Sequence, residues 1–272
     1  MTGRSLHDAL LLVLGHASVR TRLLKGDPTL IPCLGEEEHA VLSRLPAERV
    51  DRLARFLARH YYRERLVRLF RYVRLLASRT RRDPVAILST PQALTILDEA
   101  VLGSPDTSER LIRLATAFLT DRDDEIQQAH PYWRDLVDYQ AAMFLVEAAG
   151  PPTDGTAHPG PHRSPAMRVL ELQWDIPTVI THLRTGQWTV SDLLKAPTRL
   201  LVARSHQGLV TTVRCPEPIR RLLEALDGQT CPADLAVTVG LTPEQTQNLL
   251  QQLCDIGAVL WPGPTEQSGA TA

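Results

Sequence analysis

The stretch from Arg199 to Trp261 constrains the fold of this chain more than any other part of its sequence. Two runs, Arg199–Ser205 and Leu209–Arg214, are rich in the aliphatic and β-branched residues that favour strands. Between them lies His206-Gln207-Gly208, where Gly can adopt the positive φ of a tight turn. The pattern therefore predicts an antiparallel β-hairpin.

Three short helices are expected to follow this hairpin. Apolar residues at helical spacing predict the first at Glu217–Leu226 and the second at Pro232–Val239. The third begins at Thr242, which can cap a helix, and Pro243 suits the first helical position. Gln245 can complete a capping box with Thr242. A hairpin followed by three helices is typical of a winged helix-turn-helix domain.

The charge of this module disfavours a nucleic-acid duplex as its ligand. Residues 216–262 carry a net charge of −4, whereas DNA-reading helices neutralise phosphates with Lys and Arg. The third helix instead exposes a row of amides, which can hydrogen-bond a peptide, and the edge of the hairpin is a template for an added strand. A small structural domain that binds nothing is the alternative. The residues expected to contact a peptide are Arg204, Leu209, Val210, Thr211, Thr212, Val213, Arg214, Gln245, Asn248 and Gln252.

The run LLVARS…GLVTTVRCPEPIRRLLEALDG resembles the recognition elements (RiPP recognition elements) that hold precursor peptides in peptide natural-product pathways. Over most of residues 1–262 the chain is similar in architecture to the partner proteins of multinuclear iron-dependent oxidative enzymes, such as the MbnC-type and TglI-type subunits. This resemblance implies that the leader of a precursor peptide is held as an extra strand. It also implies an iron-dependent TIM-barrel oxidase on a separate chain, which supplies all the iron ligands.

The remaining sequence predicts an α+β protein with several segments. Residues 1–149 read as an all-α helical bundle that docks the partner enzyme. Residues 150–165, with five Pro and three Gly, predict a linker. Residues 166–262 are expected to form the winged module, with a strand at Met167–Ile176 completing a three-stranded antiparallel sheet. Residues 263–272 are expected to be a disordered tail.

An Arg-rich stretch lies within the predicted bundle. Residues 46–82 contain twelve Arg and carry a net charge of +9. They predict a long helical stretch that either breaks near His60 or runs on with different neighbours in its two halves. Three interpretations of its charge stay open: a solvated face, a docking face for an acidic partner, or a surface for nucleic-acid backbone. The continuous stripe at helical spacing is Arg52, Arg55, Arg59 and Arg63.

No known catalytic or metal-binding motif was found in the sequence. The Zn-protease, nucleophile-elbow, P-loop and dinucleotide patterns are missing, and an enzyme with an unfamiliar site is a further alternative. His158 and His162 are four residues apart, but Pro159 and Pro161 prevent a helical ligand pair. The four widely spaced Cys lack paired zinc spacing and predict neither a metal site nor a disulfide framework. We expect no cofactor, no membrane segment and a cytoplasmic location.

Together these observations predict a non-catalytic accessory protein of RiPP biosynthesis. It would bind a leader peptide along Leu209–Arg214 and present the peptide to a partner enzyme in a heterodimer. The alternative is a DNA-binding transcriptional regulator that uses the winged module and the Arg-rich helix. Replacing Thr211 or Val213 with Pro is expected to abolish peptide binding and to leave the bundle folded.

Overall fold

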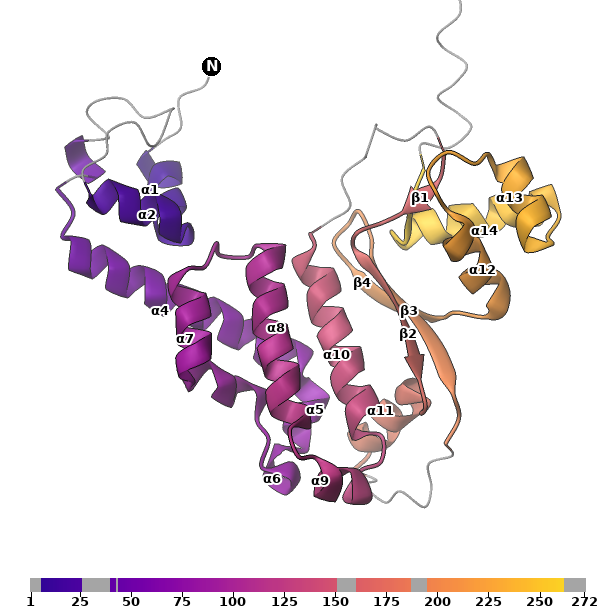
Figure 1. The fold of residues 1–272 in the computed structure, drawn as a ribbon, viewed down its shortest axis with the longest axis horizontal. Coiled ribbons are helices and arrows are strands. Elements are labelled where there is room, and N and C mark those ends of the chain that lie inside the picture. The colour runs from indigo at the N-terminus through magenta and orange to yellow at the C-terminus, as the bar shows by residue number, and fades with distance from the viewer. Residues whose placement is uncertain (1–5, 26–39, 43, 151–159, 187–194, 262–272) are drawn as a thin grey trace, which may run out of the picture. The chain divides into compact units, whose positions relative to one another are not determined.

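The computed structural model describes residues 6–25, 40–42, 44–150, 160–186 and 195–261 (Figure 1). The chain divides into two compact units, residues 1–122 and residues 123–272. The predicted class is confirmed: the protein is α+β, with a helical N-terminal region and a three-stranded antiparallel sheet.

The first unit is helical in its described residues, and polar caps set several of its helix boundaries. Thr90 accepts a hydrogen bond from the Ala93 N–H, and Ser104 accepts one from Thr107, each directly before a Pro at the start of a helix. The elements are α1 (Leu6–Gly15), α2 (Ala17–Leu24), α4 (Ala47–Leu69), α5 (Arg71–Leu75), α6 (Ala77–Thr80), the 3-10 helix η1 (Pro84–Ser89), α7 (Pro91–Asp98) and α8 (Pro105–Thr120).

Helix α4 passes through His60 without a break, and the Arg-rich stretch is interrupted later, at Phe70 and Leu76. Leu53 lies outside the buried side of this helix, because it is 46% exposed. The buried side in the first half is formed by small residues at i+4 spacing, and it continues directly into the buried side of the second half. The buried residues of this row are Val50, Ala54, Ala58, Tyr62 and Leu66.

The second unit contains the sheet and the three predicted helices. The third helix has the predicted capping box, with Thr242 and Gln245 bonding each other's backbone N–H. The elements are α9 (Asp124–Ala129), α10 (Trp133–Ala148), β1 (His162–Arg163), β2 (Met167–Leu172), α11 (Ile176–Arg184), β3 (Thr198–Arg204), β4 (Val210–Arg214), α12 (Glu217–Ala225), α13 (Pro232–Val239), α14 (Pro243–Asp255) and β5 (Val259–Leu260).

Strand β3 lies at the centre of the antiparallel sheet β2-β3-β4 and is buried on both of its faces. Leu201 and Ala203 join the apolar cluster that α12, α13 and α14 form on one face. Leu200 and Val202 point to the opposite face by the alternation of strand side chains. Helix α10 covers that face, since it contacts all three strands (Figure 1).

This packing places α10 differently from the sequence prediction. The sequence predicts that residues 123–149 belong to the N-terminal bundle, whereas the structure groups them with the sheet. The physical reason is that β3 is a continuous aliphatic run, and such a strand needs apolar cover on both faces. The sequence pattern of α10 as a helix was right, but its packing partner was not encoded locally.

The predicted linker is ordered at its C-terminal end. His162 and Arg163 form β1, which pairs antiparallel with β5. The Gly160 N–H also donates to the Gly228 carbonyl, 2.9 Å away. Residues 151–159 of the linker and residues 262–272, which include the predicted tail, lie outside the described residues.

The end of α14 lies directly against the start of the β3–β4 turn. Gly257 has φ +76°, and a Cβ added there would lie 2.0 Å from the carbonyl oxygen of Arg204. Only a residue without a side chain fits this position, because the neighbouring atoms belong to backbone. Gly257 therefore fixes how closely α14 approaches the hairpin.

Candidate functional site

The outer edge of β4 presents hydrogen-bonding groups that no other strand uses in the described part of the chain. The Ser205 N–H bonds the Leu209 carbonyl at 2.9 Å, and the Cys215 N–H bonds the Arg199 carbonyl at 2.9 Å. Hydrogen-bonded pairs alternate along an antiparallel ladder, and the register aligns Leu201 with Val213. Thr211 and Val213 therefore bond β3, while the backbone groups of Val210, Thr212 and Arg214 point outward.

The side chains of β4 are held from both faces. Thr212 lies 3.1 Å from the hydroxyl of Tyr139 on α10, a contact that the sequence did not indicate. Arg214 donates to Asp175 at 2.7 Å. Val213 packs on the opposite face, in the cluster shared with α14. The side chains of β4 are therefore held by neighbouring elements of the unit. The outer backbone edge of the strand is the part that is open to a ligand.

The predicted contact residues at the two ends of this region have different surroundings. Arg204, at the end of β3, donates from its guanidinium to the Glu147 carbonyl of α10, so it is already engaged within the unit. Leu209 is 63% exposed at the start of the returning strand. An exposed apolar side chain next to an open strand edge is available to a ligand.

The amides of α14 lie on its exposed face, as the pattern predicted. Gln245 is already in use, because its side-chain oxygen accepts from the Thr242 N–H at 3.0 Å. Asn248 and Gln252 are exposed on the same helix. Of the three predicted α14 contacts, Asn248 and Gln252 keep their hydrogen-bonding groups available for a ligand.

The opposite edge of the sheet, β2, has an equivalent row of outward groups. The Arg204 N–H bonds the Ala166 carbonyl at 3.0 Å, and the register aligns Met167 with Ala203. By the same alternation, Leu170 bonds β3 and the backbone of Val169 points outward. The sequence analysis did not single out this edge, although the charged residues Arg168 and Glu171 in this strand are typical of an edge strand.

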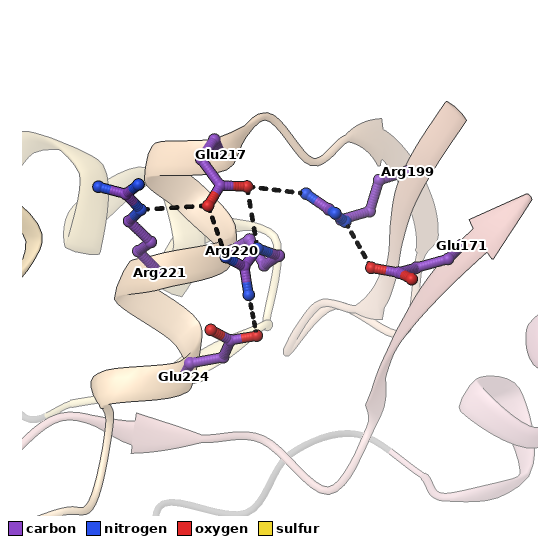
Figure 2. Close-up of polar contacts among 6 residues, drawn as sticks. All are labelled: Glu171, Arg199, Glu217, Arg220, Arg221 and Glu224. Carbon is purple, nitrogen blue, oxygen red and sulfur yellow. Dashed lines mark hydrogen bonds and ion pairs between the residues drawn. The ribbon is translucent and has the colours of Figure 1, made fainter. Parts of the chain in front are cut away.

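An ion-pair network joins β2, β3 and α12 beside that edge (Figure 2). Arg199 bridges Glu171 at 3.0 Å and Glu217 at 3.2 Å. Glu217 also pairs with Arg220 at 2.5 Å and with Arg221 at 3.1 Å. The hydrogen bonds from Arg220 and Arg221 lower the pKa of Glu217 to about 2. A carboxylate held this firmly by guanidinium groups is a structural link and a poor proton donor or acceptor near neutral pH.

All four Arg of the predicted docking stripe are exposed on α4, but they are not equally available. Arg55 pairs with Asp51 at 3.0 Å and with Asp98 at 3.2 Å. Arg59 donates to Ser89 at 3.1 Å. Part of the stripe therefore serves to bind α4 to its neighbours.

Arg59 and Arg63 line a cleft of about 330 Å³ between α4 and η1, together with Phe56 and Leu88. Phe56 is 63% exposed and stacks on the ring of His60, with the ring centroids 6.0 Å apart. The sequence analysis missed Phe56, which sits on the outer side of the helix between Arg55 and Arg59. Its exposure gives the basic surface an apolar centre.

The described residues also bear on metal-binding and membrane-spanning functions. No group of three or more His, Cys, Asp or Glu side chains there is placed to hold a metal ion. No helix among those residues is long and apolar enough to cross a membrane. No protein-family model matches the sequence, and the search of curated proteins found no match. The candidate functional surfaces of the described residues are therefore the sheet edges, the amide face of α14 and the basic cleft beside α4.

Proposed function

We propose that this chain is a non-catalytic accessory protein of RiPP biosynthesis, acting in the cytoplasm. Its second unit would bind a precursor leader peptide as a strand added to β4. The observation that carries the proposal is the outward backbone row of Val210, Thr212 and Arg214. Main-chain hydrogen bonds along such an edge give affinity for an extended peptide, and neighbouring side chains give specificity.

The charges of residues 216–262 favour a peptide over DNA as the ligand of the three C-terminal helices. Arg220 and Arg221 are the bases of residues 216–262, and both pair with Glu217. Neither guanidinium is free of a carboxylate, whereas affinity for DNA depends on unpaired cations that neutralise phosphates. The amides Asn248 and Gln252 supply donors and acceptors without fixed charge.

The first unit would dock the modifying enzyme, an iron-dependent TIM-barrel protein on another chain. The cleft with Phe56, Arg59 and Arg63 supports this part of the proposal, because an aromatic anchor with flanking Arg is typical of protein interfaces. Tethering the leader on one unit raises the effective concentration of the peptide core at the partner's active site.

The strand-addition step can be tested with a proline scan of β4. The N–H groups of Thr211 and Val213 bond β3, so a Pro at either position would break the β3–β4 ladder. Contrary to the prediction from the sequence, those two variants test folding and not peptide binding. A Pro at Thr212 removes an outward N–H and leaves the ladder intact. Thr212→Val is the matched control, because it keeps the N–H and removes only the hydroxyl.

Random 20-residue peptides displayed on phage would be selected against the whole wild-type chain. We expect selected peptides to lose at least about tenfold in affinity in Thr212→Pro and to keep most of it in Thr212→Val. Equal binding to all three proteins would refute strand addition at β4. A shift of mixed-sequence duplex DNA, without any Thr212-dependent peptide, would instead favour the transcriptional regulator.

The docking step needs a separate experiment. The tagged chain would be expressed with its chromosomal neighbours, and co-purifying proteins would be identified by mass spectrometry and metal analysis. An iron-containing enzyme that is lost when Arg59 and Arg63 are both replaced by Glu would support the proposal. Arg113→Glu, at an exposed Arg of α8 in the same unit, is the control that should retain the enzyme.

A further inference from the structure

The β2 edge offers a second place where an extended chain could pair with this sheet. The backbone of Val169 and Glu171 points away from β3, as the register and the flanking hydrogen bond require. Val169 is 38% exposed, although it is a large aliphatic residue in a strand. The row begins at Val169, because the Met167 carbonyl already accepts from Arg168 at 2.8 Å.

A hollow of about 250 Å³ lies between this edge and α12. Its apolar lining comes from Met167, Val169 and Leu223. The volume is below the ~300–1,000 Å³ typical of small-molecule sites, so it suits an inserted side chain better than a free ligand. If a peptide strand paired with β2, the side chain opposite Val169 would lie on the same face of the sheet as the Val169 side chain. That face borders the hollow, so this side chain could enter it.

The charges around the hollow leave a positive balance. Among its acidic and basic residues, Glu171 is paired with Arg199, and Arg220 is paired with Glu217 and Glu224. Arg163 and Arg168 are exposed, and within the described residues neither forms an ion pair with a carboxylate. Arg168 donates only to backbone carbonyls, those of Pro165 and Met167. The site is therefore complementary to an acidic chain.

We propose that the β2 edge and this hollow form a second peptide-binding site, separate from β4, that takes an extended acidic segment. One large apolar side chain of the segment enters the hollow beside Val169 and Leu223. A carboxylate two residues away, on the same face of the added strand, lies near Arg163, which also lines the hollow. The site goes beyond the leader-binding edge, because it would let the sheet hold two extended segments at once.

Two kinds of variant separate this site from β4. Val169→Pro removes an outward N–H without disturbing the β2–β3 ladder, and Val169→Ile is the control that keeps the N–H and the apolar surface. The pair Arg163→Glu with Arg168→Glu reverses the charge and leaves the backbone unchanged. Thr212→Pro reports on the β4 edge alone, and urea unfolding of each variant checks that the second unit stays folded.

The probe is a displayed library of random 12-residue peptides, selected against the whole wild-type chain. We expect a class of peptides with an acidic and a large apolar residue two positions apart. Their affinity should fall at least about tenfold in Val169→Pro and in the double Glu variant. It should change little in Val169→Ile and in Thr212→Pro.

Other outcomes would overturn the proposal. Selected peptides that all depend on Thr212, and none on Val169, would leave only the β4 site. A concentration-dependent dimer that Val169→Pro dissociates, with no peptide bound at that edge, would show that β2 pairs with a second copy of the chain. If Val169→Pro unfolds, unchanged peptide binding by the double Glu variant would by itself refute the site.

Discussion

Replacing Gly257 with Ala should be among the most damaging single-methyl changes in the second unit. An L-residue at φ +76° costs about 1–2 kcal/mol. The new Cβ would also lie 2.0 Å from the Arg204 carbonyl oxygen and 2.8 Å from the Ser205 Cα, so backbone must move. Overpacking of this kind costs about 1–3 kcal/mol more. The expected loss is about 2–5 kcal/mol, a large fraction of the ~5–15 kcal/mol that stabilises a typical domain.

Gly240→Ala is the matched control for this prediction. Gly240 ends α13 at φ +72°, but an added Cβ there would have no atom within 4 Å. Its cost should be about 1–2 kcal/mol, because it has the same backbone strain as Gly257→Ala and no steric clash. Urea unfolding followed by tryptophan fluorescence, to which buried Trp133 contributes, would measure both variants. If Gly257→Ala is no more destabilising than Gly240→Ala, the close approach of α14 to the hairpin is wrong.

Further predictions concern a carboxylate, a hydroxyl and the thiols. Because Arg220 and Arg221 hold the Glu217 carboxylate, its pKa of about 2 should be visible in an NMR titration and should rise toward 4.5 in Arg220→Gln. The stabilising contribution of Glu217 is thus complete above pH 4.5 and is lost as the pH falls toward 2; an unchanged titration in the variant would contradict this network. Tyr139→Phe removes the hydrogen bond to Thr212 and should lower the free energy of unfolding by about 1 kcal/mol in urea, and an unchanged stability would contradict a stabilising role for this bond. Iodoacetamide at pH 8 should label exposed Cys231 before Cys215, whose burial raises its thiol pKa; peptide mass spectrometry would reveal the opposite order.

Much of the second unit was predictable because its signals are local. Thr242, Pro243 and Gln245 specify the start of α14 within four residues, and the capping box formed as expected. Gly208 likewise adopts φ +83° in the turn between the two predicted strands. Such features depend on near neighbours in the chain, so periodicity and capping rules are sufficient to find them.

The parts that were not predictable depend on contacts distant in the sequence. Nothing near Tyr139 indicates that α10 will cover the sheet and reach Thr212, 73 residues later. The choice of which β4 residues face outward depends on the register with β3, and this reverses with a shift of one residue. The sequence pattern correctly predicted a strand at Leu209–Arg214. It could not predict the register of that strand with β3.

The Arg stripe shows a further limit of sequence patterns. Helical spacing correctly placed Arg52, Arg55, Arg59 and Arg63 on exposed positions of α4. It could not show that Arg55 is neutralised by Asp98, which lies 43 residues further along the chain. Helical spacing predicts which residues share one face of a helix. Whether each charged residue on that face is available to a partner depends on the ion pairs that the tertiary fold creates.

The double burial of β3 has a consequence for how this protein could be divided or transplanted. A fragment that begins at Ala166, after the Pro-rich segment, would contain every strand of the sheet but would lack α10. It would expose the face that carries Leu200 and Val202 to water, and an apolar sheet face left open in this way favours aggregation. The part of the chain that keeps both faces of β3 covered therefore begins at Asp123, and gene fusions that cut at the Pro-rich segment are expected to leave one sheet face exposed.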